Sequence, residues 1–428
     1  MTGAIITLVV VLFLLLASSA PIAVALGLTS FLYFFYFTTI PLTQVPERLF
    51  NSLNSFPLMA IPFFVLAAGI MSRGGISRRL IAAGNAIVGE VRGGLAATAV
   101  LACMFFAAIS GSSPATVVAV GTLIIPAMVN SGYGKKFSTG LVATSGSLGI
   151  LIPPSIPLIV YGIATEESIG DLFIAGILPG IMAGLMLLLL VFVISRRRNL
   201  GVVDESQRMT RSDKLRALRD AVLSLALPGI VLGGIYGGVF TPTEAAAVAV
   251  AYALILALGI YRELSIKDLG EVLLRSTRTS AMIMFIIANG ILFSFVLTSE
   301  RIPGQITELF LGYNLNTFTF LLLVNILLLI AGAFMETSSA ILIIAPILLP
   351  IALTLGVNPI HLGVIMVMNL EIGMVTPPLG LNLFVASGIS KMSVLQVARA
   401  AMPSALVLLV ALALVTYLPF ISLALLGQ

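Results

Sequence analysis

The 428-residue chain has few charged residues, one cysteine and one histidine. Its 22 Lys and Arg and 17 Asp and Glu make 9% of the sequence, far below the roughly 25% of soluble domains, and this excludes a soluble protein. Cys103 and His361 stand alone, which excludes disulfide frameworks, zinc clusters and iron–sulfur sites. Residues 132–136 (GYGKK) lack the first glycine and the closing Ser or Thr of a phosphate-binding loop, so the chain should not hydrolyse ATP.

What the sequence does contain is apolar residues. They make up 59% of the chain, with mean hydropathy +1.17, and long apolar stretches recur over residues 3–426. This composition predicts an all-α polytopic membrane protein without a separate soluble domain. Residues 4–20 resemble a signal peptide, but no Lys or Arg precedes them and a second apolar run starts at Ile22, so we interpret them as a retained helix.

Basic residues predict which parts face the cytoplasm. Residues 195–220 hold eight Lys and Arg against four Asp and Glu, and we predict a cytoplasmic linker at 196–220. Two further basic sets are predicted to be cytoplasmic as well: Arg73, Arg78, Arg79, Arg92, Lys135 and Lys136, and then Arg262, Lys267, Arg275 and Arg278. Residues 300–361 and the acidic stretch at Glu166 are assigned outside, which makes His361 a solvated loop end.

The two halves of the chain share one pattern. At an offset of 224 residues, prolines and one glycine coincide: Pro126, Gly149, Pro153, Pro154 and Pro179 with Pro350, Gly373, Pro377, Pro378 and Pro403. The acidic Glu166 falls on Ser390, where a basic segment begins, so residues 1–195 and 221–428 are predicted to cross the membrane in opposite senses. Inverted-topology repeats are typical of secondary transporters, whose substrate site lies near the midplane.

Each half also contains two apolar arms around a polar tip. In the first half, arms at 95–109 and 115–129 span about 22 Å each, short of the roughly 30 Å of a hydrocarbon core. We therefore predict a re-entrant helical hairpin at about 94–130, with Ser112 or Ser113 capping the outgoing helix and Pro114 at its first position. Its counterpart, at about 318–353 with a tip at 335–339, is predicted to enter from the opposite side and to meet the first tip near the bilayer centre.

A Pro-Pro pair interrupts a spanning segment in each half, at about 137–164 and 360–388. Two prolines remove two backbone donors, so each helix must unwind, and the freed carbonyls at 149–152 and 373–376 need partners inside lipid. Na⁺, a hard cation, suits such oxygens, and helix N-termini favour a carboxylate substrate. Side-chain ligands are predicted from these residues: Ser112, Ser113 and Ser145 for one ion, and Ser338, Ser339, Asn369 and Thr376 for the other. The alternative is structural, with Ser and Gly allowing close helix packing around tolerated kinks.

Three carboxylates fall within the predicted membrane segments. Glu336 and Glu371 lie at the second tip and just before the second Pro-Pro pair, where they are candidates for tuning ion affinity or carrying protons. Glu244 follows Thr241 and Pro242, and we expect it to cap the start of a helix.

Several stretches together resemble a known family, in chain order: SGSSPATVV at 110–118, GILIPPSIP at 149–157, GVFTPTEAAAV at 238–248, APILLP at 345–350, NPIHL at 358–362 and TPPLGLNLF at 376–384. They resemble the large membrane subunit of tripartite ATP-independent periplasmic (TRAP) transporters, the DctM-like type, over essentially the whole chain. The resemblance implies sodium-coupled uptake of small organic acids across a bacterial inner membrane by an elevator mechanism, not an enzyme activity. Both chain termini are predicted to be periplasmic.

The resemblance also implies where ligands bind. At least two coupling Na⁺ ions are expected: one at Ser110, Gly111 and Ser112 with Gly149 and Pro153, the other at Glu336, Thr337 and Ser338 with Gly373 and Pro377. The substrate, a C4-dicarboxylate, a keto acid or sialic acid, is expected between the tips, at Ser113 and Ser339, near Ser155 and Asn382. The expected partners are a periplasmic substrate-binding protein and a separate small membrane subunit of about four helices, with no nucleic acid.

Three other readings stay open on the sequence. A stand-alone sodium/dicarboxylate symporter would work without a binding protein. An intramembrane serine hydrolase would use Ser112 or Ser113, but it needs a base nearby and the chain has one histidine, His361. A passive channel would transport without a sodium gradient and without saturation by substrate.

Overall fold

The computed structural model describes residues 3–18, 20–201, 209–312 and 316–427, and every regular element in these ranges is a helix. Nine of these helices are long and apolar enough to cross a membrane. Counting the bent pair Lys135–Leu151 and Ile156–Thr165, whose axes differ by 42°, as one span makes ten. The predicted all-α polytopic membrane protein is therefore confirmed. Residues 202–208 of the predicted linker lie outside the described residues, and its last part, from Arg211, is helical.

The helices before the linker have these bounds: α1 Gly3–Ala17, α2 Ile22–Tyr36, α3 Gln44–Leu53, the 3-10 helix η1 Phe56–Met59, α4 Ala60–Arg73, α5 Ile76–Val88, α6 Gly94–Ser110, α7 Ser113–Asn130, α8 Lys135–Ser145, α9 Leu148–Leu151, α10 Ile156–Thr165 and α11 Ile169–Arg197. The remainder of the chain has these: α12 Arg211–Tyr236, α13 Pro242–Leu254, the π-helix η3 Ile255–Ile260, α14 Ile266–Ser299, α15 Ile302–Gly312, α16 Thr317–Phe334, α17 Thr337–Thr354, α18 Pro359–Gly373, α19 Leu381–Ser390, α20 Val394–Tyr417, α21 Phe420–Leu423 and the 3-10 helix η4 Ala424–Leu426.

The same order of elements occurs twice. A helix pair with a short break (α6 and α7, α16 and α17) is followed by a helix that is broken (α8–α10, α18–α19) and then by one long helix (α11, α20). α10 packs against α17, and α19 packs against α7, so each broken helix also contacts the helix pair of the other half. The predicted domain boundaries and the re-entrant nature of the pairs stay predictions.

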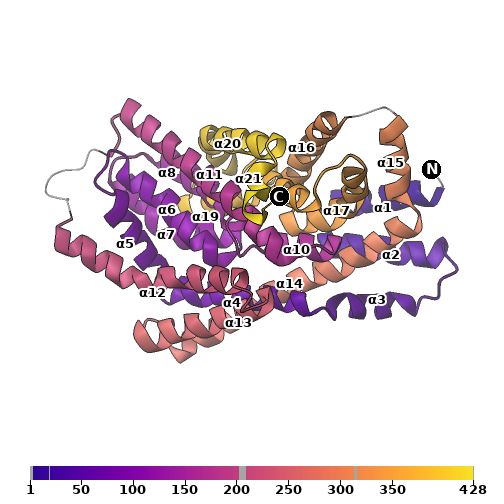
Figure 1. Ribbon diagram of the computed structural model, residues 1–428, viewed down its shortest axis with the longest axis horizontal. Coiled ribbons are helices and arrows are strands. Elements are labelled where there is room, and N and C mark those ends of the chain that lie inside the picture. Colours follow the sequence, from indigo (N-terminus) through magenta and orange to yellow (C-terminus); the bar gives the residue numbers. More distant parts are fainter. Residues whose placement is uncertain (1–2, 19, 202–208, 313–315, 428) are drawn as a thin grey trace.

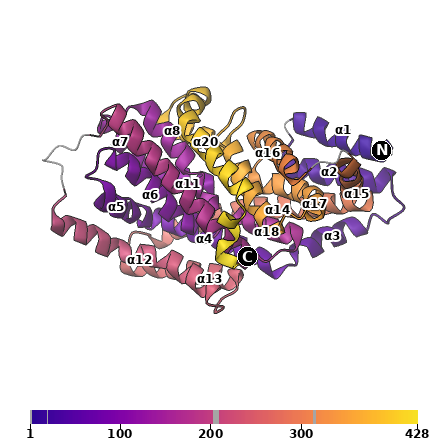
Figure 2. The same ribbon diagram turned by 45° about the horizontal axis from the view of Figure 1, so that its top comes forward.

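Both views place these elements along the long axis of the molecule (Figure 1, Figure 2). α5, α6, α7 and α8 lie toward one end, and α1, α2 and α15 toward the other. The first end carries the basic residues of α5, of the start of α8 and of the end of α11. These basic segments therefore share one side, whose assignment to the cytoplasm stays a prediction, as does the placement of the termini.

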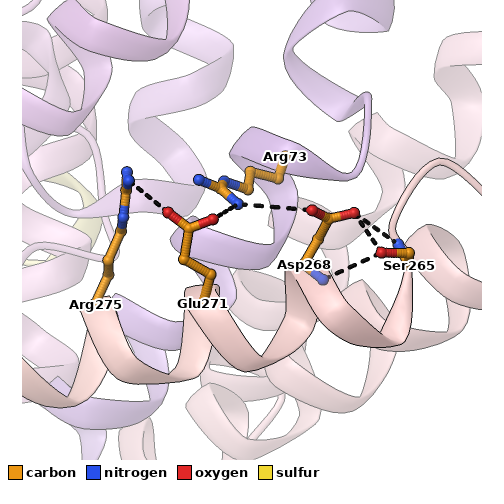
Figure 3. A network of polar contacts seen from close by, with 5 residues as sticks. All are labelled: Arg73, Ser265, Asp268, Glu271 and Arg275. Carbon is orange, nitrogen blue, oxygen red and sulfur yellow. Dashed lines mark hydrogen bonds and ion pairs between the residues drawn. The ribbon is translucent and has the colours of Figure 1, made fainter.

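Ion pairs fix α4 against α14 (Figure 3). Arg73, the last residue of α4, lies with its Nη1 2.7 Å from Glu271 Oε2 and 4.0 Å from Asp268 Oδ1 on α14. Arg275 Nη2 lies 2.6 Å from the other oxygen of Glu271, and Ser265 shares a capping box with Asp268 at the start of α14. Partly exposed pairs contribute little free energy each, so their main effect is to set the orientation of the two helices.

A second group of ion pairs joins α5 to the turn before α14. Arg78 and Arg79 both pair with Glu263, Arg79 at 2.7 Å, and the Arg79 guanidinium stacks over the Tyr261 ring. α4 also packs against both α13 and α14. We call α2–α4 with α12–α14 the frame.

Glu244 has the role that the sequence predicts. Thr241 is the N-cap of α13, Pro242 is the first helical residue, and Glu244 completes a capping box by accepting the Thr241 amide hydrogen bond at 2.8 Å. The expectation of a helix cap is confirmed, because Thr, Pro and Glu at this spacing satisfy the free amides of a first helical turn.

The prediction for His361 was wrong, because the structure buries this residue instead of exposing it. Its side chain is 2% exposed, with Nδ1 2.7 Å from Ser422 Oγ and Nε2 3.3 Å from the Thr416 carbonyl oxygen. α21 and η4 pack against α11, and α21 also packs against α18, so the C-terminal segment covers the start of α18. The charges of the loops do not predict this contact between the C-terminal segment and α18.

Candidate substrate and ion site

One cavity of about 560 Å³ brings the four helix breaks together. Its polar lining residues come from both tips and from α18, namely Ser112, Ser113, Glu336, Thr337, Ser338, Ser339 and Glu371. The frame supplies an opposite wall that is mostly apolar and is formed by Met282, Ile283, Phe285 and Ile286 of α14, with Thr279. No Lys, Arg or His lines this cavity in the described part of the chain.

The first tip is built from hydroxyl groups. Ser110 Oγ lies 2.9 Å from Thr116 Oγ1, and Thr116 donates to the carbonyl oxygen of Ser112, also at 2.9 Å. Ser112 is the N-cap of α7, but it makes no side-chain capping bond, and Pro114 is the second residue of the helix, one position later than predicted. The predicted N-cap position is therefore confirmed, but the expected side-chain capping bond is absent, so the first amides of α7 have no serine cap.

The second tip uses a carboxylate instead. Glu336 is the N-cap of α17: its Oε2 accepts from the Ser339 amide at 3.1 Å and from the Ser339 hydroxyl at 3.2 Å, while its Oε1 accepts from Ser338 at 3.0 Å. Thr337 is buried beside the second break, where its hydroxyl lies 3.1 Å from Met374 Sδ. An acidic N-cap is favoured by the positive end of the helix dipole.

The first break lies directly on the first tip. The Ile156 amide, at the start of α10, donates to the Gly111 carbonyl oxygen at 3.3 Å. A Cβ added to Gly149 would lie 2.5 Å from Thr116 Oγ1 and 3.0 Å from the Ser112 carbonyl oxygen. Only a glycine permits this approach, and Pro153 is buried beside it.

The second break lies on the second helix pair in the same way. The Leu379 amide donates to the Ala333 carbonyl oxygen at 3.1 Å, and a Cβ added to Gly373 would lie 2.4 Å from the backbone carbon of Gly332. Thr376 bonds its own helix at the Ile372 carbonyl, 2.8 Å away, and Pro377 is exposed. A smaller cavity of about 260 Å³ opens here between Gly380 and Glu336, so Glu336 lines two cavities.

A hydrogen-bonded cluster joins the two halves at the centre. Asn382 Nδ2, on α19, lies 2.5 Å from Ser113 Oγ on α7, 3.4 Å from Ser147 Oγ and 3.0 Å from Glu371 Oε1. Glu371 is 1% exposed, and neither its Oε2 nor Asn382 Oδ1 has a hydrogen-bond partner among the described residues. A buried polar oxygen without a partner is costly, which marks this cluster as a place for a bound polar or charged species.

Three other predicted site residues lie apart from the cavity wall. Ser145 is buried, and its hydroxyl has no hydrogen-bond partner among the described residues. Asn369 donates from Nδ2 to Asn325 Oδ1 on α16 at 2.6 Å, while its own Oδ1 lacks a partner in the same ranges. Ser155 caps α10 through the Leu158 amide and is buried.

Sequence reasoning missed Ser147 and Thr116. Both bond to residues that were predicted, but nothing in their local sequence distinguishes them from ordinary helical Ser and Thr. A signal was available for Ser147, because the 224-residue offset pairs it with Glu371.

A bundle of membrane-spanning helices, several of them broken where they meet a polar cavity, defines the class of membrane transporters. The chain belongs to the family described as "Tripartite ATP-independent periplasmic transporter, DctM component", whose sequence model matches residues 9–421. The resemblance seen in the motifs is thereby confirmed. Because this is a transporter family, the chain is a TRAP permease and not an enzyme. The alternative of an intramembrane serine hydrolase is therefore excluded.

Two relatives show how widely the similarity extends. The chain is 50% identical to the C4-dicarboxylate TRAP transporter large permease protein DctM of Pseudomonas aeruginosa, over 94% of this chain and 93% of that one. It is 44% identical to the isethionate TRAP transporter permease protein DctMQ of Oleidesulfovibrio alaskensis, over 95% of this chain but 64% of that one.

A solved structure supports the fold. The YdaH transporter of Alcanivorax borkumensis, described as having an unusual topology, superposes with a TM-score of 0.63 over 91% of this chain and 90% of that chain. The sequences are 14% identical, so the likeness concerns the fold alone.

Proposed function

We propose that this chain is the large transmembrane subunit of a sodium-coupled, binding-protein-dependent importer of small organic acids. The acids are C4-dicarboxylates and related carboxylates, with keto acids and sialic acid in the same chemical class. The observation that carries the proposal is the single cavity in which four helix breaks meet and which two carboxylates line without any basic side chain.

In this proposal, cations balance the negative charge of the two cavity carboxylates, Glu336 and Glu371. Two unit charges about 4 Å apart interact by about 4 kcal/mol at the effective dielectric of a protein surface, and by more in the interior. A dicarboxylate that entered a cavity already lined by Glu336 and Glu371 would be repelled. Binding cations with the substrate removes this repulsion, so an anion and Na⁺ enter and leave together, which is the physical basis of symport.

The residues present fit Na⁺ as a co-transported ion. At the first site, the donors are hydroxyl and carbonyl oxygens from Ser110–Ser112 and from the turn at Gly149, with the unpartnered hydroxyl of Ser145 nearby in sequence. At the second site, they are Glu336, Thr337 and Ser338 with the backbone at 373–376. All are oxygen ligands, which suits a hard monovalent cation.

In this proposal the substrate binds between the two tips, where α7 and α17 begin. Each of these N-termini carries about half a positive charge, and the free amides of α7 can donate to a carboxylate. Ser113 and Ser339 lie at these tips, and Asn382 orients Ser113 from behind. Hydroxyls and helix ends recognise any small carboxylate, so the proposal leaves selection among acids to the binding protein.

An elevator movement is proposed between the frame and a second body formed by α6–α11 and α16–α20. The cavity lies between the two, with polar residues on the moving body and an apolar wall on α14. An apolar wall makes no hydrogen bonds that would hold the polar site at one depth, so the moving body can slide along it. The two helix pairs act in this proposal as re-entrant hairpins that enter from opposite sides.

The partners proposed are a periplasmic binding protein and a small membrane subunit. The family's description as tripartite supports both. The relative named DctMQ supports the second, because part of its length has no counterpart in this chain. The stand-alone symporter is not favoured, since the relatives are subunits of TRAP transporters.

The test is uptake of radiolabelled succinate into liposomes that contain this chain and its small subunit. Four arms vary the inward sodium gradient (Na⁺ or choline) and the purified binding protein (present or absent). We expect accumulation only with both, and saturation with binding protein. Equal flux in all four arms would refute the proposal, and sodium-driven flux without binding protein would restore the stand-alone symporter.

A further inference from the structure

A second cavity lies away from the transport site, between α8, α11 and α20. It has a volume of about 220 Å³ and is lined by three basic residues: Lys136 of α8, Arg399 of α20 and Arg198, which directly follows α11. The other lining residues are apolar or neutral: Phe137, Leu141, Leu190, Ile194, Ala400, Pro403 and Ser404. Residues from 136 to 404 in the sequence thus build one basic pocket, which we call the α8–α11–α20 pocket.

The three cations have no acidic partner among the described residues. Elsewhere on the same side, Arg73, Arg79 and Lys214 each lie within 3 Å of a carboxylate oxygen, at 2.7, 2.7 and 2.5 Å. No ion pair forms at Lys136, Arg198 or Arg399 in the described ranges, and the lining of their pocket contains no Asp or Glu. Three like charges around one pocket repel one another unless an anion lies between them.

The equivalent place in the other half is closed by the chain itself. At the 224-residue offset, Phe137 and Arg198 correspond to His361 and Ser422. Ser422 belongs to α21, which packs against α11 and α18, and its hydrogen bond to His361 is buried. The α8–α11–α20 pocket lacks such a cover within the described residues, and it is basic where the other place is neutral.

The surroundings of the pocket are those of a lipid site. Along α11 and α20, toward the membrane interior, large apolar side chains are exposed: Leu185 57%, Leu189 63%, Met402 56% and Leu406 55%. These belong to spanning helices, so acyl chains cover them. A headgroup in the pocket would continue into acyl chains along these two helices.

We propose that the α8–α11–α20 pocket binds the phosphate headgroup of an anionic phospholipid from the leaflet on the basic side. Arg198 and Arg399 supply the forked donors that suit phosphate oxygens, and Lys136 adds a point charge at the start of α8, whose free amides also favour an anion. A diphosphate lipid such as cardiolipin matches three cations more closely than the single phosphate of phosphatidylglycerol does. Basic pockets between transmembrane helices are suited to such headgroups.

The experiment measures lipid binding to the purified full chain in nanodiscs of phosphatidylcholine, by titration with cardiolipin or phosphatidylglycerol and native mass spectrometry. The pocket variant is K136Q/R198Q/R399Q. The matched control is R262Q/K267Q/R278Q, which removes the same charge from exposed basic residues outside the pocket. We expect the pocket variant to bind anionic lipid at least about tenfold more weakly and the control to bind like the original chain, because each basic residue near a lipid surface adds about a factor of five.

Further titrations distinguish a lipid headgroup from free phosphate as the ligand of the pocket. Inorganic phosphate and the soluble headgroup glycerophosphoglycerol are titrated against bound cardiolipin, and we expect neither to displace it at millimolar concentration. Equal weakening in both triple variants, equal binding of phosphatidylcholine, or full displacement by inorganic phosphate would each overturn the proposal. All six residues are exposed, and the melting temperature of both variants checks that folding is unchanged.

Discussion

The two halves of this transporter share a backbone plan but differ in their chemistry. At the first tip, hydroxyls bond to one another and Ser112 leaves the amides of α7 uncapped, whereas at the second Glu336 caps α17. The first Pro-Pro pair is buried and the second is exposed beside a further cavity. Both carboxylates that line the main cavity, Glu336 and Glu371, belong to the second half. The residue of the first half that the 224-residue offset pairs with Glu371 is the uncharged Ser147.

This difference teaches that symmetry and charge are separate features. Breaks at equivalent positions produce a cavity with helix ends on two sides, which depends on Pro, Gly and the backbone. The acidity of the cavity comes from one half alone, so the two proposed ion sites should differ in affinity. Substitutions at paired positions can test how far the halves are equivalent.

The largest effect is expected from E371Q. Glutamine keeps the size of the side chain and an oxygen that can accept from Asn382, but it removes the carboxylate that binds a cation in the proposed function, and contacts to charged groups contribute about 1.5–3 kcal/mol. We expect sodium-driven uptake to fall about tenfold to a hundredfold. The comparison is S147A at the paired position, which loses only a 3.4 Å contact and should retain most activity. Equal losses in the two variants would mean that the halves contribute alike.

Next in size are the glycines of the two breaks. In G373A the new methyl meets the backbone of Gly332 at 2.4 Å, whereas in G149A the nearest backbone atom, the Ser112 carbonyl oxygen, is 3.0 Å away and only the Thr116 hydroxyl is closer, at 2.5 Å. We expect G373A to destabilise the protein by about 1–3 kcal/mol and G149A by less. Thermal unfolding in detergent measures both, with G388A as the control because its methyl meets nothing within 4 Å. A larger loss in G149A would contradict the packing described above.

A smaller effect is expected from single hydroxyls at the tips. S112A and S338A should each raise the sodium concentration for half-maximal uptake about threefold to tenfold, the size of one polar contact, without lowering the melting temperature. Ser338 also bonds Glu336, so S338A should have the larger effect. Unchanged sodium dependence in both variants would mean that these serines serve helix packing and do not bind Na⁺.

The smallest effect is expected at the ion pairs of Glu263, which join α5 to the turn before α14 and do not line the cavity. Burial raises the pKa of Glu263, but the hydrogen bond and charge of Arg79, with Arg78, outweigh it and leave the pKa below its ordinary value. A carboxyl with a lowered folded-state pKa stabilises the protein at neutral pH, and this contribution disappears as the pH falls through that pKa. E263Q should therefore melt slightly lower than the original chain at pH 7, with the gap closing toward pH 3 while uptake at pH 7 is kept. A gap that widens in acid would have the wrong sign.

Much of the fold follows from local sequence. The helix breaks fall at residues where proline removes donors and glycine permits close approach, as at Gly149 and Pro153, and Thr241 with Glu244 caps a helix as its spacing predicts. At the first tip the sequence predicts the right N-cap residue, Ser112, but not that its side chain leaves the amides of α7 uncapped.

The sequence by itself determined that this chain is a membrane transporter with paired breaks, because hydrophobicity, proline and glycine act over a few neighbouring residues. Only the tertiary structure decided what meets at those breaks. Asn382 reaches Ser113 across 269 positions, and His361 is buried by a segment 61 positions away. Such contacts depend on how whole helices pack, and no local pattern encodes them.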